Sequence, residues 1–235
     1  MNNEKLTIYG DSIMKGVVLE SGRYKIGEKI ESFAERIFTS VTNRSKFGST
    51  IEKGVETLEA DLDRNVLTNG VVLLEFGGND CDFDWKEISA NPQLDRDPNT
   101  AIDKFISLYK HAISLVRKKN LTPVVANLPP ISSEKYLNFI CRSGLSKENI
   151  LFWLGDENAI YRYQERYSRA IEEIAESENI PLVDLRGAFL SDRKIEEYLC
   201  EDGIHPSLKG QKLIIDTFRR FFSRNGYLKL VPAAD

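Results

Sequence analysis

The segment Lys5-Leu-Thr-Ile-Tyr-Gly-Asp-Ser-Ile13 sets the frame for interpreting the rest of the chain. Its apolar, β-prone part runs from Leu6 to Tyr9, and Gly10-Asp11-Ser12 ends it abruptly. A strand that stops in a tight glycine-containing turn presents the next side chain at the carboxyl edge of its sheet, where open α/β sheets bind ligands. Ser12 is therefore a candidate nucleophile, provided that a base reaches its hydroxyl. Because Gly-Asp-Ser is also an ordinary turn composition, the assignment needs support from other segments.

Apolar, β-prone segments alternate with segments of helical periodicity along the chain. We expect strands at 6–9, 41–45, 71–76, 122–128 and 180–185, and helices at 29–39, from about 50, at 100–119, at 158–178 and from about 207. The segment 71–76 is almost continuously apolar, which is typical of a central strand buried on both faces of a parallel sheet. The alternation predicts a three-layer α/β/α sandwich, flavodoxin-like, with a parallel sheet of about five strands.

No repeat or change in composition divides the chain, so we expect one domain over residues 1–235. Residues 15–25 look irregular, and long loops are expected at about 81–99 and 131–155, near the edge that carries the site. The large aromatic residues between 131 and 155 favour core positions over a lid. Near the C-terminus, Phe221, Phe222 and Tyr227 look exposed, and their packing on the body or on a second subunit is left open, as is the oligomeric state.

Composition narrows the possible partners. A net charge of −4 gives no general attraction to a phosphate backbone, so no nucleic-acid partner is expected. No apolar run approaches the roughly 20 residues that span a bilayer, so no stable membrane insertion is expected. Residues 1–5 lack the basic and apolar regions of a signal peptide, which favours a cytoplasmic location. Three widely spaced cysteines, Cys81, Cys141 and Cys200, argue against a disulfide framework.

The chain has two histidines, so the search for a general base is short. His111 lies inside the predicted helix 100–119 beside lysines and is interpreted as a surface residue. His205 follows a predicted turn and has Asp202 three residues before it. A carboxylate and an imidazole on one loop meet through the ring Nδ1–H, which leaves Nε2 free to take a proton. The alternative is a loop stabilised by an Asp–His hydrogen bond.

Two further turns follow predicted strands. Gly77-Gly78-Asn79-Asp80 comes directly after the strongest strand, and the Asn79 amide is a candidate donor to a developing oxyanion. Gly48 lies between the strand at 41–45 and the next helix, and its backbone N–H is a second candidate donor. Both segments are also compatible with plain turns.

Taken together, these segments resemble the four blocks of the SGNH (GDSL) hydrolase superfamily. They are Gly10-Asp-Ser12-Ile, Gly48 within Asn-x-Ser-x-x-Gly-x-Thr, Gly77-x-Asn79-Asp80, and Asp202-x-x-His205-Pro. The resemblance extends from residue 6 to about residue 215. The first block departs from the name-giving motif at Ile13, where that motif has Leu.

The resemblance implies a GDSL-type ester hydrolase that acts through an acyl-enzyme. Ser12 is then the nucleophile, His205 the base and later the acid, and Asp202 the orienting carboxylate. The oxyanion hole would combine the N–H groups of Ser12 and Gly48 with the Asn79 amide. Nothing in this scheme requires a metal or a cofactor. The expected substrates are small soluble esters, with short acyl groups or O-acetylated carbohydrate among them.

Residues near the oxyanion hole are candidates for substrate binding, namely Asp11, Asp80, Cys81 and Trp85. The alternating carboxylates of Asp80-Cys-Asp-Phe-Asp84 resemble the opening of a calcium loop, but Trp85 and Asn91 stand where that pattern needs Gly and Glu. Cys81 is not expected to be a nucleophile, since no second histidine is placed to activate it.

Two alternatives remain open at the level of the sequence. One is a lysophospholipase or thioesterase of the same family, because fold-level analogy does not choose among substrates. The other is a non-catalytic flavodoxin-like module that captures a small molecule or phosphate at helix N-termini. The pair Asp202 and His205 favours the hydrolase, because activation of a serine needs it and phosphate capture does not.

Overall fold

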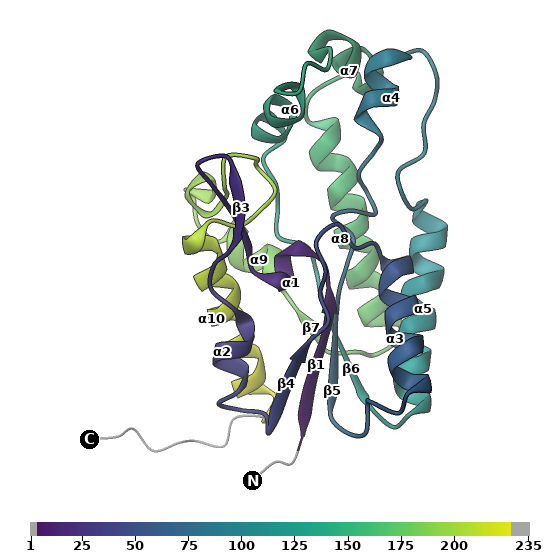
Figure 1. The fold of residues 1–235 in the computed structure, drawn as a ribbon, viewed down its shortest axis with the longest axis vertical. Helices are drawn as coiled ribbons and strands as arrows, with labels where there is room; N and C mark the ends of the chain where they lie inside the picture. Colours follow the sequence, from purple (N-terminus) through teal and green to yellow (C-terminus); the bar gives the residue numbers. More distant parts are fainter. Residues whose placement is uncertain (1–3, 227–235) are drawn as a thin grey trace, which may run out of the picture.

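Five parallel strands form the central sheet of the computed structural model, which describes residues 4–226 (Figure 1). They are β1 (Lys5–Gly10), β4 (Ser40–Asn43), β5 (Val71–Glu75), β6 (Thr122–Ala126) and β7 (Leu182–Val183), in the spatial order β4-β1-β5-β6-β7. The predicted parallel sheet of about five strands is confirmed. After β1, the chain adds β4 on one side of β1 and then β5 on the opposite side of β1. Open α/β sheets form their ligand crevice at such a reversal, at the carboxyl ends of the strands.

The central strands β1, β5 and β6 are buried on both faces, which explains their nearly continuous apolar sequences, whereas the edge strand β4 is exposed to half-buried. Successive side chains of a strand point to opposite faces, so Leu6 and Ile8 belong to one apolar cluster and Tyr9 to the other. In the same way, Leu73 and Leu74 of β5 lie in different clusters.

Helices cover both faces of the sheet and complete the three layers (Figure 1). One face packs against α3 (Ile51–Asp63), α5 (Ile102–Lys118) and α8 (Ala159–Ser177). The other packs against α2 (Ile30–Ala34), α9 (Leu185–Leu190) and α10 (Leu208–Arg224). No helix within residues 4–226 has both the length and the apolar composition needed to cross a bilayer.

A separate group of short helices stands beyond the carboxyl ends of the strands (Figure 1). These are α4 (Trp85–Ala90), α6 (Ser133–Cys141) and α7 (Lys147–Leu154), so the expectation of loops at 81–99 and 131–155 is corrected. Their caps are local: side chains of Asp84, Ser132 and Ser146 accept hydrogen bonds from the first turns. Their apolar residues form a cluster of their own, separate from the main core. Because these helices are short, their sequences show too few apolar repeats to be recognised as helical.

A hairpin replaces the irregular stretch expected at 15–25. Strands β2 (Val17–Glu20) and β3 (Arg23–Ile26) pair in antiparallel fashion. Ser21 and Gly22 both have positive φ, 52° and 71°, which is the geometry of a two-residue type I′ turn. The hairpin stands next to the last long loop of the chain, as the bond from the Gly22 N–H to the Glu201 carboxylate shows.

Several boundaries also differ from the predicted ones. Strand β7 has two residues instead of six, because Asp184 caps α9 and ends the strand. Helix α2 ends at Ala34, and turns carry the chain to Phe38. A short 3₁₀ helix, Ile195–Tyr198, precedes the final loop.

The aromatic residues near the C-terminus are less exposed than expected. Phe222 is completely buried in the cluster beneath α10, and Phe221 packs against the same cluster. Tyr227 lies outside the described residues. Ser207 caps α10 as the sequence predicts, by accepting a hydrogen bond from the Gly210 N–H.

Candidate active site

Ser12 is the first residue of α1 (Ser12–Lys15), directly after the carboxyl end of β1. Asp11 caps this helix, since its Oδ1 accepts a hydrogen bond from the Ile13 N–H at 2.8 Å. Gly10 permits the tight turn, because a Cβ there would lie 2.9 Å from the Met14 side chain. The backbone N–H of Ser12 belongs to the first turn, where helical N–H groups have no intrahelical acceptor.

The loop before α10 carries Asp202 and His205 in a fixed arrangement. Asp202 Oδ1 accepts hydrogen bonds from the backbone N–H groups of Ile204 at 3.1 Å and His205 at 3.0 Å. Its Oδ2 lies 2.7 Å from His205 Nδ1. An antiparallel bridge between Leu199 and Pro206 closes the loop.

Burial raises the pKa of Asp202, but the hydrogen bonds and charge of His205 and the Ile204 N–H outweigh it, so the net pKa lies below the ordinary value. The carboxylate is therefore ionised at neutral pH. An ionised carboxylate at this distance fixes the ring orientation and keeps a proton on Nδ1, which leaves Nε2 as the basic nitrogen.

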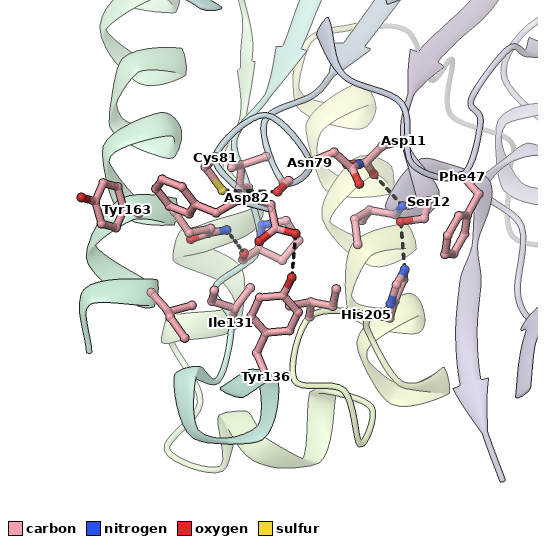
Figure 2. A pocket seen from close by; sticks show the side chains of 18 of the residues that line it. Asp11, Ser12, Phe47, Asn79, Cys81, Asp82, Ile131, Tyr136, Tyr163 and His205 are labelled. Carbon is pink, nitrogen blue, oxygen red and sulfur yellow. Dashed lines mark hydrogen bonds between the residues drawn. The ribbon is translucent and has the colours of Figure 1, made fainter. Parts of the chain in front are cut away.

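The structure brings Ser12 and His205 together across 193 positions of sequence: Ser12 Oγ lies 2.9 Å from His205 Nε2 (Figure 2). Both side chains are largely buried. The distance is within the range over which a general base accepts a proton from a nucleophile. A serine hydroxyl, an imidazole and a carboxylate are thus joined in one hydrogen-bonded chain.

Two aromatic residues that sequence reasoning missed hold the imidazole. Phe47 stacks on His205 with an interplanar angle of 11°, and Tyr24 of the hairpin packs on it at a centroid distance of 5.1 Å. The Tyr24 hydroxyl also donates to Asp202 Oδ2 at 3.4 Å. Phe47 and Tyr24 are both exposed, 57% and 43%. In the sequence, the signal for Phe47 was its position as an aromatic residue directly before Gly48, which was already a candidate site residue.

Asn79 lies at the same edge as Ser12, after β5. Its Nδ2 donates to Asp11 Oδ2 and to the Ser49 carbonyl, each at 3.1 Å. The amide is therefore oriented by two acceptors, one in the turn that carries Ser12 and one directly after Gly48. Gly48 adopts a φ of +69°, in the left-handed region that favours glycine, and follows Phe47. The donation of these groups to an oxyanion stays a prediction.

Three buried carboxyl groups, those of Asp11, Glu75 and Asp80, lie close to the site. The sequence analysis did not identify Glu75. Burial raises the pKa of Glu75 well above its usual range, and the charge of Asp11 adds to this. Burial also raises the pKa of Asp11, to about 6, although the Ile13 N–H and contacts with His205, Glu75 and Asn79 oppose the rise. The Glu75 carboxyl is therefore protonated at neutral pH. A lone glutamate in an otherwise apolar strand was the signal.

Asp80, a predicted substrate-binding residue, is fully buried and lies outside the set of residues that line the cavity beside Ser12. Both of its oxygens accept from the Ile51 N–H at 3.1 Å, at the start of α3. Asp82 instead bonds Trp85, and Asp84 caps α4. The three carboxylates of the calcium-like stretch therefore serve different partners, and residues 4–226 contain no cluster of three His, Cys, Asp or Glu side chains suited to a metal ion.

A cavity of about 200 Å³ opens beside Ser12 and His205. Asp11, Cys81 and Trp85, three of the predicted substrate-binding residues, line it. Asp82 lies within residues 81–85, which the sequence suggests as a rim of the site, and it lines the far side of the cavity together with Tyr136, which was not predicted (Figure 2). Most of the remaining lining is apolar or aromatic and comes from the loop after β6, from α8 and from the segments that carry Ile13, Tyr24, Phe47 and Ile204. Residues 131–155 thus contribute both core and cavity wall.

Cys81 is a buried thiol that donates to the Gly78 carbonyl at 3.3 Å. Burial raises its pKa well above the usual range, and the charges of Asp82 and Asp80 add to this. The thiol is therefore protonated at neutral pH and is a poor nucleophile. His111 is half-exposed and pairs with Glu59 at 3.1 Å, as expected of a surface residue.

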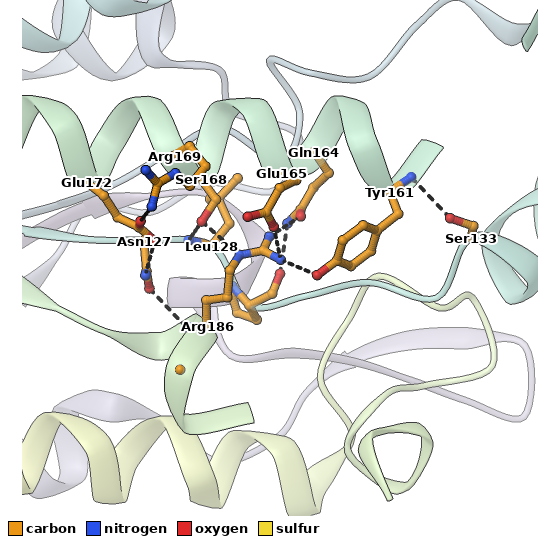
Figure 3. Close-up of polar contacts among 12 residues, drawn as sticks. Asn127, Leu128, Ser133, Tyr161, Gln164, Glu165, Ser168, Arg169, Glu172 and Arg186 are labelled. Carbon is orange, nitrogen blue, oxygen red and sulfur yellow. Dashed lines mark hydrogen bonds and ion pairs between the residues drawn. The ribbon is translucent and has the colours of Figure 1, made fainter. Parts of the chain in front are cut away.

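A buried arginine supports one wall of the cavity from behind (Figure 3). Arg186 donates to Gln164 and to Ser168 Oγ, the latter at 2.9 Å. Gln164 in turn donates to the Pro129 carbonyl at 2.8 Å. Because Gln164 and Pro129 line the cavity, this network fixes its shape.

The model of the GDSL-like lipase/acylhydrolase family matches residues 8–213. The chain belongs to this family. The matched range includes Ser12, Gly48, Asn79, Asp202 and His205, and membership makes this protein a carboxylic ester hydrolase.

Solved structures with the same fold include other members of this class. A lipase/acylhydrolase from Enterococcus faecalis is 20% identical, with a TM-score of 0.65, over 98% of this chain and 100% of that one. A catalytic mutant of an acetylxylan esterase from Geobacillus stearothermophilus is 17% identical, with a TM-score of 0.65, over 98% and 97% of the chains. At these identities the likeness shows the fold of the GDSL-like hydrolase. No curated protein sequence matches this chain significantly.

Proposed function

We propose that this GDSL-like hydrolase cleaves small soluble carboxylic esters by acyl transfer through Ser12. The observation that carries the proposal is the hydrogen-bonded chain from Ser12 Oγ to His205 Nε2, 2.9 Å, and from His205 Nδ1 to Asp202, 2.7 Å. Ser12 Oγ attacks the ester carbonyl while His205 Nε2 takes its proton. Asp202 stabilises the imidazolium that forms.

The second half of the cycle reverses the proton transfer. His205 gives its proton to the leaving alcohol as the tetrahedral intermediate collapses, and an acyl-Ser12 ester remains. Water then attacks this ester with His205 as the base, and the acid departs as Ser12 regains its proton. Every step uses the same Nε2 atom, which the Asp202 bond keeps directed at Ser12.

The oxyanion is proposed to bind at the Ser12 turn. The Ser12 N–H begins α1, Gly48 is placed on the loop after β4, and Asn79 lies next to Asp11. In the free enzyme both hydrogens of the Asn79 amide are engaged, one by Asp11 and one by the Ser49 carbonyl. The amide donates to the oxyanion when it gives up the Ser49 carbonyl, while Asp11 continues to hold it.

The cavity supports a substrate with a small acyl or alcohol group. Its volume of about 200 Å³ suits short chains, and its walls are mostly apolar and aromatic. Esters with short acyl groups fit this space, O-acetylated carbohydrate among them. A phosphate-binding role finds less support, because none of the described residues that line the cavity is Lys or Arg.

Hydrolysis of p-nitrophenyl acetate and butyrate tests the proposal. The Ser12→Ala and His205→Ala variants are expected to lose at least about 10⁴-fold in kcat, since triad members act as a unit. His111→Ala is the matched control, because that histidine is exposed and remote from the cavity. Equal activity in the wild type and Ser12→Ala, or fluorophosphonate labelling of a residue other than Ser12, would contradict the mechanism.

A further inference from the structure

The far side of the cavity carries a carboxylate that the proposed mechanism does not use. Asp82 Oδ2 accepts a hydrogen bond from the Tyr136 hydroxyl at 2.6 Å, and Oδ1 accepts one from Trp85 Nε1 at 2.8 Å. Figure 2 shows Asp82 and Tyr136 well apart from Ser12 and His205 across the cavity. Each oxygen accepts a hydrogen bond, as an ionised carboxylate does. Burial raises the pKa of Asp82 above its ordinary value, and the hydrogen bonds from Tyr136, Phe83 and Trp85 oppose the rise, so a cation beside this group would be needed to hold its charge fully.

No cationic side chain within residues 4–226 neutralises the Asp82 carboxylate. Asp82 makes no ion pair with any residue between 4 and 226, and both of its side-chain partners are neutral. Among the cavity-lining residues that the structure describes, the carboxyl groups belong to Asp11, Glu75 and Asp82, and lysine and arginine are absent. Burial keeps Glu75 protonated, and Asp11 is engaged by the Asn79 amide on the near side of the site. The field in the cavity is therefore negative, and Asp82 is its unpaired source on the far side.

The other polar groups on that side are already engaged. Two donors, the Tyr136 hydroxyl and Trp85 Nε1, point at Asp82, and the Tyr163 hydroxyl points away from Asp82 and Ser12 (Figure 2). The Gln164 amide donates to the Pro129 carbonyl, and its oxygen accepts from Arg186. A ligand that reaches this wall thus meets acceptor oxygens and no free donor, so it must itself supply a hydrogen-bond donor.

The surroundings of Asp82 are aromatic. Phe83, Trp85, Tyr136 and Tyr163 all line the cavity, and their rings contact one another edge to face. Aromatic rings attract a cation, and this attraction strengthens where water is excluded. An uncompensated carboxylate among aromatic rings favours a cationic partner over a neutral one, and it repels an anion.

We propose that Asp82 is a specificity residue that binds an alkylammonium group of the substrate while the ester carbonyl lies at Ser12. The inference rests on the proposed function, and it narrows the substrates to amine-bearing esters. Anionic esters are disfavoured by the same charge. Asp82 does not take part in the acyl transfer; it acts on binding.

Three ligands of similar length and different charge test the inference: n-butylammonium, 1-butanol and butyrate. Calorimetry on the Ser12→Ala variant measures their binding without turnover, and inhibition of p-nitrophenyl acetate hydrolysis measures it in the wild type. We expect n-butylammonium to bind about tenfold more tightly than 1-butanol, because a charge-assisted hydrogen bond replaces a neutral one. Butyrate is expected to bind least well.

Three variants test whether the Asp82 carboxylate causes the preference for n-butylammonium over 1-butanol. In Asp82→Asn, the ratio of the 1-butanol to the n-butylammonium dissociation constant should fall to about 1–2, since the charge is gone. Asp95→Asn, which removes an exposed charge, is the matched control and should keep the ratio. Tyr136→Phe removes a neutral hydrogen-bond donor and keeps the Asp82 charge, so it should keep the ratio. If Asp82→Asn does not fold, Tyr136→Phe is the variant that tests the role of the Asp82 charge.

The outcomes separate the two proposals. Absence of ester hydrolysis in the wild type would count against the proposed function. Hydrolysis combined with equal or tighter binding of 1-butanol or butyrate would overturn this inference alone. A cation preference that survives in Asp82→Asn, or that disappears in Tyr136→Phe, would also overturn the assignment to the Asp82 carboxylate.

Discussion

Asp11 Oδ2 accepts a hydrogen bond from the Asn79 amide at 3.1 Å, and Asp11 Oδ1 accepts one from the Ile13 N–H at 2.8 Å. One carboxylate therefore sets both the turn that carries Ser12 and the amide proposed to face the oxyanion. Because each oxygen serves a different donor, Asp11 has a role that a neutral residue of the same shape cannot fill. Asp11 lines the cavity, as its predicted substrate-binding role requires, and it also organises the Ser12 turn and the Asn79 amide.

The Asp11→Asn variant tests this positioning role. Asparagine keeps one acceptor but places an NH₂ group against the Ile13 N–H or against the Asn79 amide, so one contact becomes repulsive. We expect kcat for p-nitrophenyl acetate to fall about 10- to 100-fold, somewhat less than the loss of an oxyanion donor, with a smaller change in KM. Asp63→Asn, at an exposed position of α3, is the control. An unchanged kcat in Asp11→Asn would show that the Asn79 amide is positioned by other groups.

The buried Asp80 makes a pH-dependent contribution to stability. Burial raises the pKa of Asp80 to about 7, against opposing hydrogen bonds from Thr100 and the Ile51 N–H. The folded protein therefore binds this proton more tightly than the unfolded chain does. The resulting stabilisation is complete below the unfolded pKa, near 4, and is lost as pH rises through about 7.

Asp80→Asn removes this titration. We expect the variant to gain stability relative to the wild type between pH 5 and pH 8, because only the wild type must bury a charge at the higher pH. Urea unfolding at both pH values measures the two free-energy differences. Asp95→Asn, an exposed substitution, should show no such trend. A constant difference between Asp80→Asn and the wild type would mean that Asp80 titrates alike in the folded and unfolded states.

The centre of the sheet could be predicted from sequence because β1, β5 and β6 are buried on both faces and leave nearly continuous apolar runs. Val71 to Phe76 is the clearest example, and the turns after it and after β1 fall where parallel strands end. The meeting of Ser12 with His205 followed from the same logic, since every motif was placed at one edge. A hydrogen bond between Asp202 and His205 was predictable because the two residues share one short loop.

The walls of the cavity were harder to predict because they depend on contacts between distant segments. The pairing of Asp82 with Tyr136 joins residues 54 positions apart, in two stretches expected to be loops. Tyr24 reaches His205 only because the hairpin folds over the final loop. Glu75 gave a signal, an ionisable residue within an apolar strand, but its position beside the Gly10-Asp11 turn is fixed by strand register.

Gly203 fixes the distance between the Asp202–His205 loop and α6. It has a φ of +74°, and a Cβ would lie 2.7 Å from the Ser132 carbonyl oxygen. The Ser132 N–H also donates to the Gly203 carbonyl at 2.8 Å, so the two backbones are in close contact. Glycine is therefore favoured at position 203 both by the positive φ and by the lack of room for a Cβ atom.

Gly203→Ala should lower both stability and kcat, because relief of the clash moves the loop that carries Asp202 and His205. Gly155→Ala is a matched control, since Gly155 has a φ of +79° with open space around its Cβ position. Both substitutions carry a conformational cost of about 1–2 kcal/mol, and the clash adds to it at position 203 alone. Thermal unfolding and p-nitrophenyl acetate turnover compare the two variants. Equal losses in both would exclude a steric role for Gly203.

Arg186 is the buried charge on which one side of the cavity depends (Figure 3). Its guanidinium is 5% exposed, pairs with Glu165 at 2.6 Å, and donates to Tyr161 and Ser168, each at 2.9 Å. Replacement by methionine keeps much of the volume but leaves these acceptors without their donor, and it frees the Gln164 amide that supports the cavity wall.

We expect Arg186→Met to lower the free energy of unfolding by about 2–4 kcal/mol, because buried acceptors lose a charged partner. Arg169→Met is the matched control on α8: Arg169 is 60% exposed, and its pair with Glu172 should contribute less than about 1 kcal/mol. Urea unfolding measures both variants, and KM for p-nitrophenyl butyrate reports on the cavity wall. Because the wall loosens when Gln164 loses its anchor, KM should rise in Arg186→Met and stay unchanged in Arg169→Met. Equal stability of the two variants would show that water replaces the guanidinium without cost.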